Sequence, residues 1–231
     1  MNRNIAFSLL AAAGALLLAV GVSSAPITKP SWLSTVTLSD KGGHIIGNPA
    51  AATKVVEYAS YTCPHCAHFE AVDAPVLKSQ YVARGNVSFE VRNLVRDSVD
   101  LTVAMLARCG GKGKFFGNHR LLMANQAVIM GKQRNLSAAT RAKLQKEDYT
   151  GFMADAYAQF GLSKLMAQRG ISDVQAKTCL ANKATLGQIL AMTNEATGTL
   201  GLQGTPGFLV NGKVAEDVYS WDALQPLLPV N

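Results

Sequence analysis

Several features that would point to common classes of protein are scarce or absent in this sequence. Beyond residue 25 no apolar run is long enough to cross a bilayer, which excludes a multi-spanning membrane protein. No repeat period is visible, which excludes a repeat architecture. Only four cysteines are present, with a single C-x-x-C pair, so the second ligand pair of a typical zinc site is missing.

Acidic residues are in the minority. The chain has 22 lysines and arginines against 15 aspartates and glutamates, a formal net charge of +7, and its basic residues are densest in residues 112–146. Such a surplus can attract nucleic acid or an anionic membrane surface. No aromatic residues are interleaved there in a binding pattern. We therefore interpret the region as a solvated helical face and expect no nucleic-acid partner.

The first 25 residues have the organisation of a secretory signal. Residues 1–4 are short and basic, residues 5–22 are apolar, and residues 23–25 are small. The apolar run is also long enough to remain as a membrane anchor. Cleavage and anchoring both stay open, and both place the rest of the chain outside the cytoplasm, which we expect to be the periplasm.

The tetrapeptide Cys63-Pro64-His65-Cys66 places two thiols one helical turn apart. Residues 54–60, just before it, are apolar and β-branched and predict a buried strand. Apolar residues recur at helical spacing after it and predict a helix over residues 64–82. A C-x-x-C pair where a strand turns into a helix is typical of a redox site rather than of a zinc knuckle.

The order of the other predicted elements indicates an α/β fold. Residues 32–46 look like strand material broken at 40–43, and residues 87–95 predict a strand parallel to residues 54–60. Residues 98–182 are mainly helical, and a cap at Ser98 is expected to begin their first helix. Further helices are predicted over residues 98–109, 115–130, about 137–144, 151–160, 163–168 and 172–180.

The last part of the chain is expected to return to the sheet. Residues 184–200 predict an amphipathic helix, and residues 221–228 predict a final one. Between them, Asn211-Gly212 separates two short apolar runs. This pair is a strong signal for a β-hairpin with a type I′ turn, because both of its residues must adopt positive φ.

Taken together, these residues resemble the DsbA family of periplasmic thiol oxidases. The most specific stretches are residues 57–70 (EYASYTCPHCAHFE) and 204–213 (GTPGFLVNGK), and the resemblance covers nearly all of the chain after the signal. It implies a thioredoxin-like fold with an inserted α-helical subdomain. Residues 26–97 and 183–231 would form the thioredoxin-like domain, and residues 98–182 the insertion.

In the redox motif, Cys63 is the residue expected to exchange its disulfide with substrate thiols. Unpaired N–H groups at a helix start stabilise a thiolate, and His65 can add a donor or a positive charge. Pro64 occupies the first helical position, and Cys66, one turn deeper, is the expected resolving thiol. Two alternatives are an inert structural disulfide and a metal site that also uses His65 and His68; neither explains the strand-to-helix context, and no metal is expected.

The resemblance also implies supporting residues. Thr205-Pro206 matches the cis-proline pair that faces the disulfide, although Thr at this place is more like the family's isomerases; an ordinary turn proline is the alternative. Glu57 matches a glutamate beneath the disulfide, with a solvent-facing strand end as the alternative. Glu70 matches a second acidic position. His68 and His119 are interpreted as surface histidines or as core histidines with satisfied hydrogen bonds.

The two cysteines outside the motif, Cys109 and Cys179, are a candidate structural disulfide, since the exported chain would meet an oxidising compartment. Four cysteines permit three pairings, and this one depends on assigning Cys63 and Cys66 to the redox motif.

The function expected from sequence is that of an exported thiol–disulfide oxidoreductase, acting as a monomer without an organic cofactor beyond its redox-active disulfide. The resemblance implies unfolded exported polypeptides as substrates and a quinone-linked membrane partner for reoxidation. Two alternatives remain. One is a disulfide isomerase or reductase kept reduced by a membrane partner, although residues 25–54 are too few for the dimerisation domain usual in such isomerases. The other is a chaperone-like binding module without redox turnover.

Overall fold

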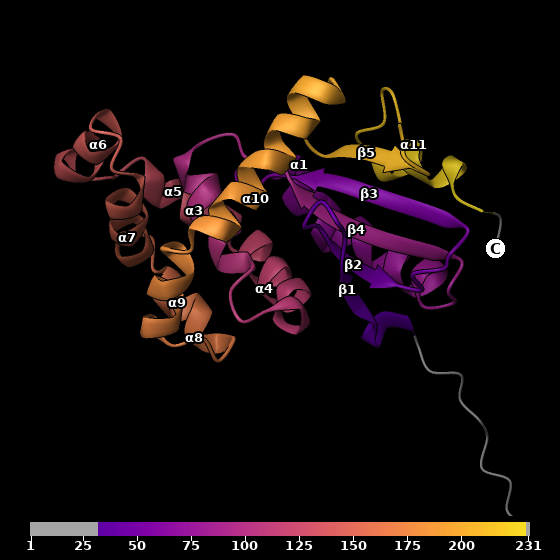
Figure 1. Cartoon of the computed structure of the whole chain (residues 1–231), viewed down its shortest axis with the longest axis horizontal. Helices are drawn as coiled ribbons and strands as arrows, with labels where there is room; N and C mark the ends of the chain where they lie inside the picture. The colour runs from indigo at the N-terminus through magenta and orange to yellow at the C-terminus, as the bar shows by residue number, and fades with distance from the viewer. Residues whose placement is uncertain (1–31, 230–231) are drawn as a thin grey trace, which may run out of the picture. The chain divides into compact units, whose positions relative to one another are not determined.

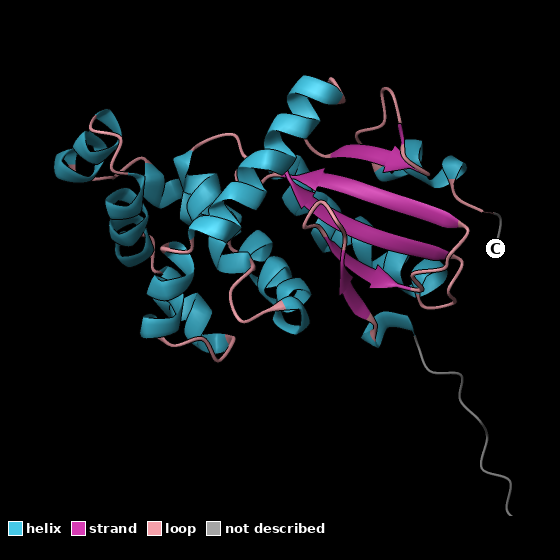
Figure 2. Cartoon of the chain, viewed as in Figure 1, coloured by secondary structure: helices cyan, strands magenta, loops and turns pink. Residues whose placement is uncertain are grey.

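The computed structural model describes residues 32–229. The predicted signal, residues 1–25, lies outside the described residues. The described part is a mixed six-stranded sheet with helices packed against it (Figure 2), so the predicted α/β class is confirmed. None of the helices in residues 32–229 has the length and apolar character needed to cross a bilayer.

The sheet is built around two parallel central strands, β3 (Thr53–Ala59) and β4 (Val87–Asn93). Both are almost entirely buried, although β3 (TKVVEYA) contains a glutamate and β4 (VSFEVRN) alternates apolar and polar residues. The full strand order is β1-β2-β4-β3-β5-β6, and the four outer strands pair antiparallel with their neighbours. These are β1 (Val36–Leu38), β2 (His44–Gly47), β5 (Gly207–Val210) and β6 (Lys213–Val214).

The hairpin between β5 and β6 forms as the sequence predicts. Asn211 and Gly212 have φ values of 51° and 79°, as a type I′ turn requires. The Asn211 carboxamide oxygen also accepts the Lys54 N–H at 2.8 Å, so the turn is anchored to the start of β3.

The helix after the redox motif is continuous from residue 64 to residue 82, as predicted, but it is not uniform. It begins as α1 (Pro64–His68), widens into a π-helical segment (Phe69–Asp73), narrows to α2 (Ala74–Leu77) and widens again (Lys78–Val82). Pro75 has no N–H to donate into the preceding turn, which accounts for the first irregularity.

The helical part of the chain differs from its prediction in two places. The first helix is capped by Asp97, not Ser98: the Asp97 carboxylate accepts the N–H groups of Val99 and Asp100. The helix expected over residues 115–130 is two helices that meet at Asn125. The helices are α3 (Ser98–Ala107), α4 (Lys112–Ala124), α5 (Gln126–Gln133), α6 (Ala138–Gln145), α7 (Tyr149–Gln159), α8 (Leu162–Gln168), α9 (Asp173–Leu180), α10 (Lys183–Asn194), continued by a π-helical segment (Glu195–Thr199), and α11 (Trp221–Leu224), continued by a 3-10 turn (Gln225–Leu227).

Figure 1 shows α6 to α9 gathered at the end of the helical part of the chain that lies away from the sheet. α10 packs against both α3 and β4. A disulfide joins Cys109, after α3, to Cys179 in α9, with 5.6 Å between their Cα atoms. This disulfide links positions 70 residues apart.

Candidate active site

Cys63 lies at the point where the loop after β3 turns into α1. It is the N-cap residue of α1, with extended backbone angles, and Pro64 occupies the first turn. No side chain caps this helix start. Its N–H groups are therefore available to the sulfur of Cys63, and the helix dipole favours a negative charge there.

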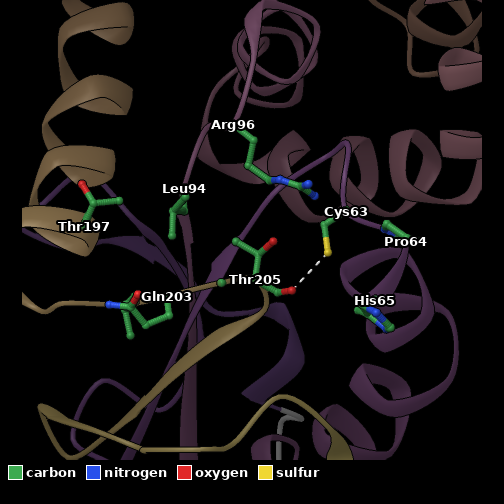
Figure 3. Close-up of a pocket in the computed structure, with 10 residues that line it drawn as sticks. Cys63, Pro64, His65, Leu94, Arg96, Thr197, Gln203 and Thr205 are labelled. Carbon is green, nitrogen blue, oxygen red and sulfur yellow. Dashed lines mark hydrogen bonds between the residues drawn. The ribbon is translucent and has the colours of Figure 1, made fainter.

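Several donors converge on the Cys63 sulfur. The largest influence on its pKa is a hydrogen bond from the Cys66 thiol, which lowers it, whereas burial raises it. The Thr205 hydroxyl and the N–H groups of Cys66 and His65 lower it further. Together they bring the pKa of Cys63 to about 4. As a neutral thiol, Cys63 donates to the Thr205 carbonyl oxygen at 3.1 Å (Figure 3). That contact favours the thiol, but the donors outweigh it. The contribution of His65 comes through its backbone, and its side chain is exposed.

Cys66 has the opposite environment. It is 0% exposed and accepts a hydrogen bond from the Ser60 N–H at 3.5 Å. Burial raises its pKa well above the ordinary value, and the hydrogen bond to Cys63 and the nearby charge of Glu57 raise it further. The pKa values of the two thiols are thus shifted in opposite directions: the surroundings of Cys63 favour the thiolate, and those of Cys66 favour the neutral thiol.

A pocket of about 500 Å³ opens beside Cys63. The Thr205–Pro206 peptide bond is cis, and the Thr205 carbonyl oxygen lies 3.1 Å from the Cys63 sulfur. The pocket is lined by Cys63, Pro64, His65, Leu94, Arg96, Thr197, Leu202, Gln203, Gly204 and Thr205 (Figure 3).

Glu57 lies in β3 and is 0% exposed, so the solvent-facing alternative for this residue is wrong. Neither of its carboxyl oxygens has a hydrogen-bond partner among the described residues. Burial raises its pKa well above the ordinary value, Glu70 raises it further, and Lys78 opposes both. Burial therefore favours the neutral form of the Glu57 carboxyl group, and its charged form would interact unfavourably with a thiolate at Cys63 or Cys66.

Glu70 is buried too, but it is paired. The Lys78 ammonium donates to its two oxygens at 2.9 and 3.0 Å, and Nε2 of His119 lies 3.6 Å from Oε2. Burial would raise its pKa, but His119 and Lys78 outweigh that effect and lower it to about 2. Nδ1 of His119 is 2.8 Å from the Tyr61 hydroxyl, so His119 is a core histidine, whereas His68 is exposed.

Three residues that were not predicted from the sequence hold the loop before Cys63 and Cys63 itself. Asp100 is fully buried and accepts hydrogen bonds from the Ser60 hydroxyl and from the N–H groups of Tyr61 and Arg96. Burial raises its pKa to about 7 against the influence of these donors. Asp97 accepts the Thr62 hydroxyl at 3.0 Å, and Gln126 donates to the Cys63 carbonyl oxygen at 2.7 Å.

Of these three, only Asp97 carried a sequence signal, because aspartate is a preferred N-cap residue. Asp100 and Gln126 lie within helices, 37 and 63 positions from Cys63, and nothing in their local sequence connects them to it. Within residues 32–229, no group of three or more histidine, cysteine or acidic side chains is arranged to hold a metal ion.

Residues 39–229 match the family model described as thioredoxin. A protein-disulfide isomerase from Novosphingobium aromaticivorans is 35% identical, with a TM-score of 0.75 over 80% of this chain and 95% of that one. Wolbachia pipientis alpha-DsbA1 has a similar fold, with 20% identity and a TM-score of 0.61 over 82% of this chain and 90% of that one.

A curated relative in Rickettsia bellii, which bears the name "Putative protein-disulfide oxidoreductase", is 29% identical over 77% of this chain. The chain spans about 60% of the length of that relative.

Proposed function

The chain belongs to the thioredoxin family, and from this premise we propose that it is a DsbA-like thiol–disulfide oxidoreductase that donates its Cys63–Cys66 disulfide to the thiols of exported polypeptides. The observation that carries the proposal is the separation of the two thiol pKa values, with Cys63 at about 4 and Cys66 raised. A stable Cys63 thiolate is a good leaving group, which makes disulfides that contain it oxidising.

The reaction follows from the positions of the two sulfurs. A substrate thiolate enters the pocket and attacks the Cys63 sulfur, so that a mixed disulfide forms and the Cys63–Cys66 bond breaks, with Cys66 as the leaving group. A second thiolate of the substrate then attacks the substrate sulfur of the mixed disulfide. Cys63 leaves as a thiolate, and the substrate has gained a disulfide while the motif has gained two electrons.

The first step leaves a negative charge on Cys66, which is buried and favours the neutral thiol. Glu57, whose pKa is raised by burial, is coupled electrostatically to both cysteines. We infer that its carboxyl group supplies a proton to Cys66 as Cys66 leaves and takes one back when the motif is reoxidised. Its unpartnered oxygens leave it free for that transfer.

The proposed location is the periplasm, with the N-terminal segment serving as an export signal or an anchor. The Cys109–Cys179 disulfide supports an oxidising compartment, because such bonds persist there and are rare in the cytosol. After each cycle the reduced motif needs an electron acceptor, for which we propose a quinone-linked membrane protein.

The test is a trapping experiment in cells. Cys66→Ala should accumulate mixed disulfides through Cys63, because the resolving thiol is missing, whereas Cys63→Ser should accumulate none and should abolish catalysed oxidation of a reduced peptide. Partners attached through Cys109 would contradict the assignment. Holdase activity toward unfolded chains that survives Cys63→Ser, with no catalysed oxidation by the unmodified protein, would favour the chaperone-like alternative.

A second candidate is disulfide isomerisation. It is favoured by the name of the Novosphingobium relative and by Thr205 before the cis-proline. Alkylation of free thiols in intact cells separates the two functions: an oxidase is found mainly with Cys63 and Cys66 joined, and an isomerase mainly with both reduced.

A further inference from the structure

Arg96 occupies the loop between β4 and α3, at the rim of the pocket beside Cys63. Its backbone is fixed, because its N–H donates to the buried Asp100 carboxylate at 3.0 Å. Its guanidinium group points toward Cys63 (Figure 3) and makes one long contact, 3.5 Å, with the Thr62 carbonyl oxygen. The side chain is exposed, so the charged end faces the space that a substrate would enter.

The charge of Arg96 is not neutralised by a neighbour. No ion pair to it is found within the described part of the chain, although two aspartates follow closely in sequence. Asp97 is occupied by two N–H groups of α3 and by the Thr62 hydroxyl. Asp100 is occupied by its three donors. A guanidinium group has five N–H donors, and most of those of Arg96 are unused.

The surroundings of this charge strengthen its effect. Among the described residues that line the pocket, Arg96 alone carries a permanent charge. Leu94, Leu202 and Pro64 form apolar parts of the wall. Charges interact more strongly beside apolar surface than in open water, and a guanidinium group can hold both oxygens of a carboxylate.

We propose that Arg96 is a specificity-determining residue that favours polypeptide substrates with a carboxylate side chain next to the reacting cysteine. This inference rests on the proposed function, since it concerns which substrates enter the same pocket. Arg96 takes no part in the bond changes: the substrate thiolate still attacks Cys63 and Cys66 still leaves. Its effect should therefore appear in the second-order rate of attack and should depend on the charge of the peptide.

The experiment uses the oxidised protein and a set of single-cysteine peptides that differ only at the residue immediately before or after the cysteine. This residue is Glu, Gln or Lys. The rate of formation of the mixed disulfide with Cys63 is measured for each peptide. Because a neighbouring charge changes the reactivity of the peptide thiol itself, each rate is divided by the rate of the same peptide with a small-molecule disulfide.

We expect the normalised rate for Glu to exceed that for Gln about threefold and that for Lys about tenfold, in at least one of the two placements. The preference should shrink at high salt, because the pair is exposed to solvent. Arg96→Gln should remove it, Arg96→Lys should keep part of it, and Arg141→Gln, at an exposed position in α6, should leave it unchanged.

Three outcomes would overturn the inference. The first is equal normalised rates for all three peptides in the wild-type protein, which leaves the proposed function standing if the rates themselves are high. The second is a preference that survives Arg96→Gln. The third is an equal loss of rate for every peptide in Arg96→Gln together with a raised pKa of Cys63, because Arg96 would then act on the Cys63 thiolate and not on the substrate. If no peptide reacts with the oxidised protein at all, the proposed function fails as well.

Discussion

The Cys63 thiolate should make the stability difference between the reduced and oxidised protein depend on pH. Its pKa is about 4 in the folded protein against an ordinary value of 9.0. A group with a lowered pKa contributes stability that is full above its unfolded pKa and is lost as pH falls through its folded pKa. The contribution should therefore be present at pH 7 and nearly absent at pH 4.

The size of the effect follows from the same numbers. Between pH 7 and a pKa of about 4, each unit of difference corresponds to ~1.4 kcal/mol, which gives ~4 kcal/mol as the upper limit. The sulfur lines an open pocket, so solvent screening reduces this value, and we expect ~2 kcal/mol. The disulfide of the oxidised form also restricts the unfolded chain, but that entropic effect does not change with pH.

The measurement is urea unfolding of both redox forms at several pH values between 4 and 7. It is made in the Cys109→Ala/Cys179→Ala background, so that only the motif changes its redox state. The free energy of unfolding of the reduced form, relative to that of the oxidised form, should rise by ~2 kcal/mol over this range. The contribution of Asp100 is common to both forms and cancels in the difference.

Two controls make the result specific. The Cys63→Ser protein has no thiolate at this position, and its free energy of unfolding should not show the rise when it is compared with that of the oxidised parent protein. Glu57→Gln removes the other group whose titration is coupled to Cys63 and should preserve it. A stability difference that is the same at both ends of the pH range would refute the lowered pKa, and with it the main support for an oxidase.

Three further predictions concern Glu57, Asp100 and the Cys109–Cys179 disulfide. Glu57→Gln should stabilise the protein at pH 7, because a buried carboxyl group with a raised pKa destabilises the folded protein as pH rises above about 4.5; urea unfolding against pH checks this. The same substitution should slow the attack of substrate thiols on the Cys63–Cys66 disulfide, which stopped-flow rates check. Asp100→Ala leaves three donors without their acceptor, so the free energy of unfolding should fall by ~3 kcal/mol. The absorbance titration of the Cys63 thiolate should also shift. An unchanged titration would show that this aspartate does not position the loop. Replacing both Cys109 and Cys179 by alanine should cost ~4 kcal/mol in thermal or urea unfolding but leave peptide oxidation intact.

The sequence was most informative where a local pattern decides the structure. The strand before the motif, the helix after it and the turn at Asn211-Gly212 form as predicted, because apolar periodicity and the need for positive φ act over a few residues. The cap of α3 was assigned one residue late, since Asp97 and Ser98 are both good N-cap residues and the choice depends on the loop geometry. The break between α4 and α5 at Asn125 was not predicted, because no proline or glycine marks it in the sequence.

What could not be predicted are the contacts that cross the sequence. Arg96, Asp100 and Gln126 meet the motif only because the first helices after β4 return to the end of β3. The partners of His119 are likewise set by packing, so its side chain could be assigned to the core or the surface but not to the space between Tyr61 and Glu70. Such placements depend on the whole fold and leave no trace in local propensity.

The contact between Gln126 and the Cys63 carbonyl bears on how separable this protein's parts are. A shortened chain in which residues 98–182 are replaced by a brief linker would keep every strand of the sheet and both thiols. It would nevertheless lose Gln126 and Asp100. The Cys63 carbonyl oxygen would then keep only the Ala67 N–H as a donor, and the Ser60 hydroxyl and the Tyr61 N–H would lose Asp100 as their acceptor. Such a miniature would have the motif without the support that fixes its first residue, so the insertion has to be inherited, transplanted or redesigned together with the cysteines it surrounds.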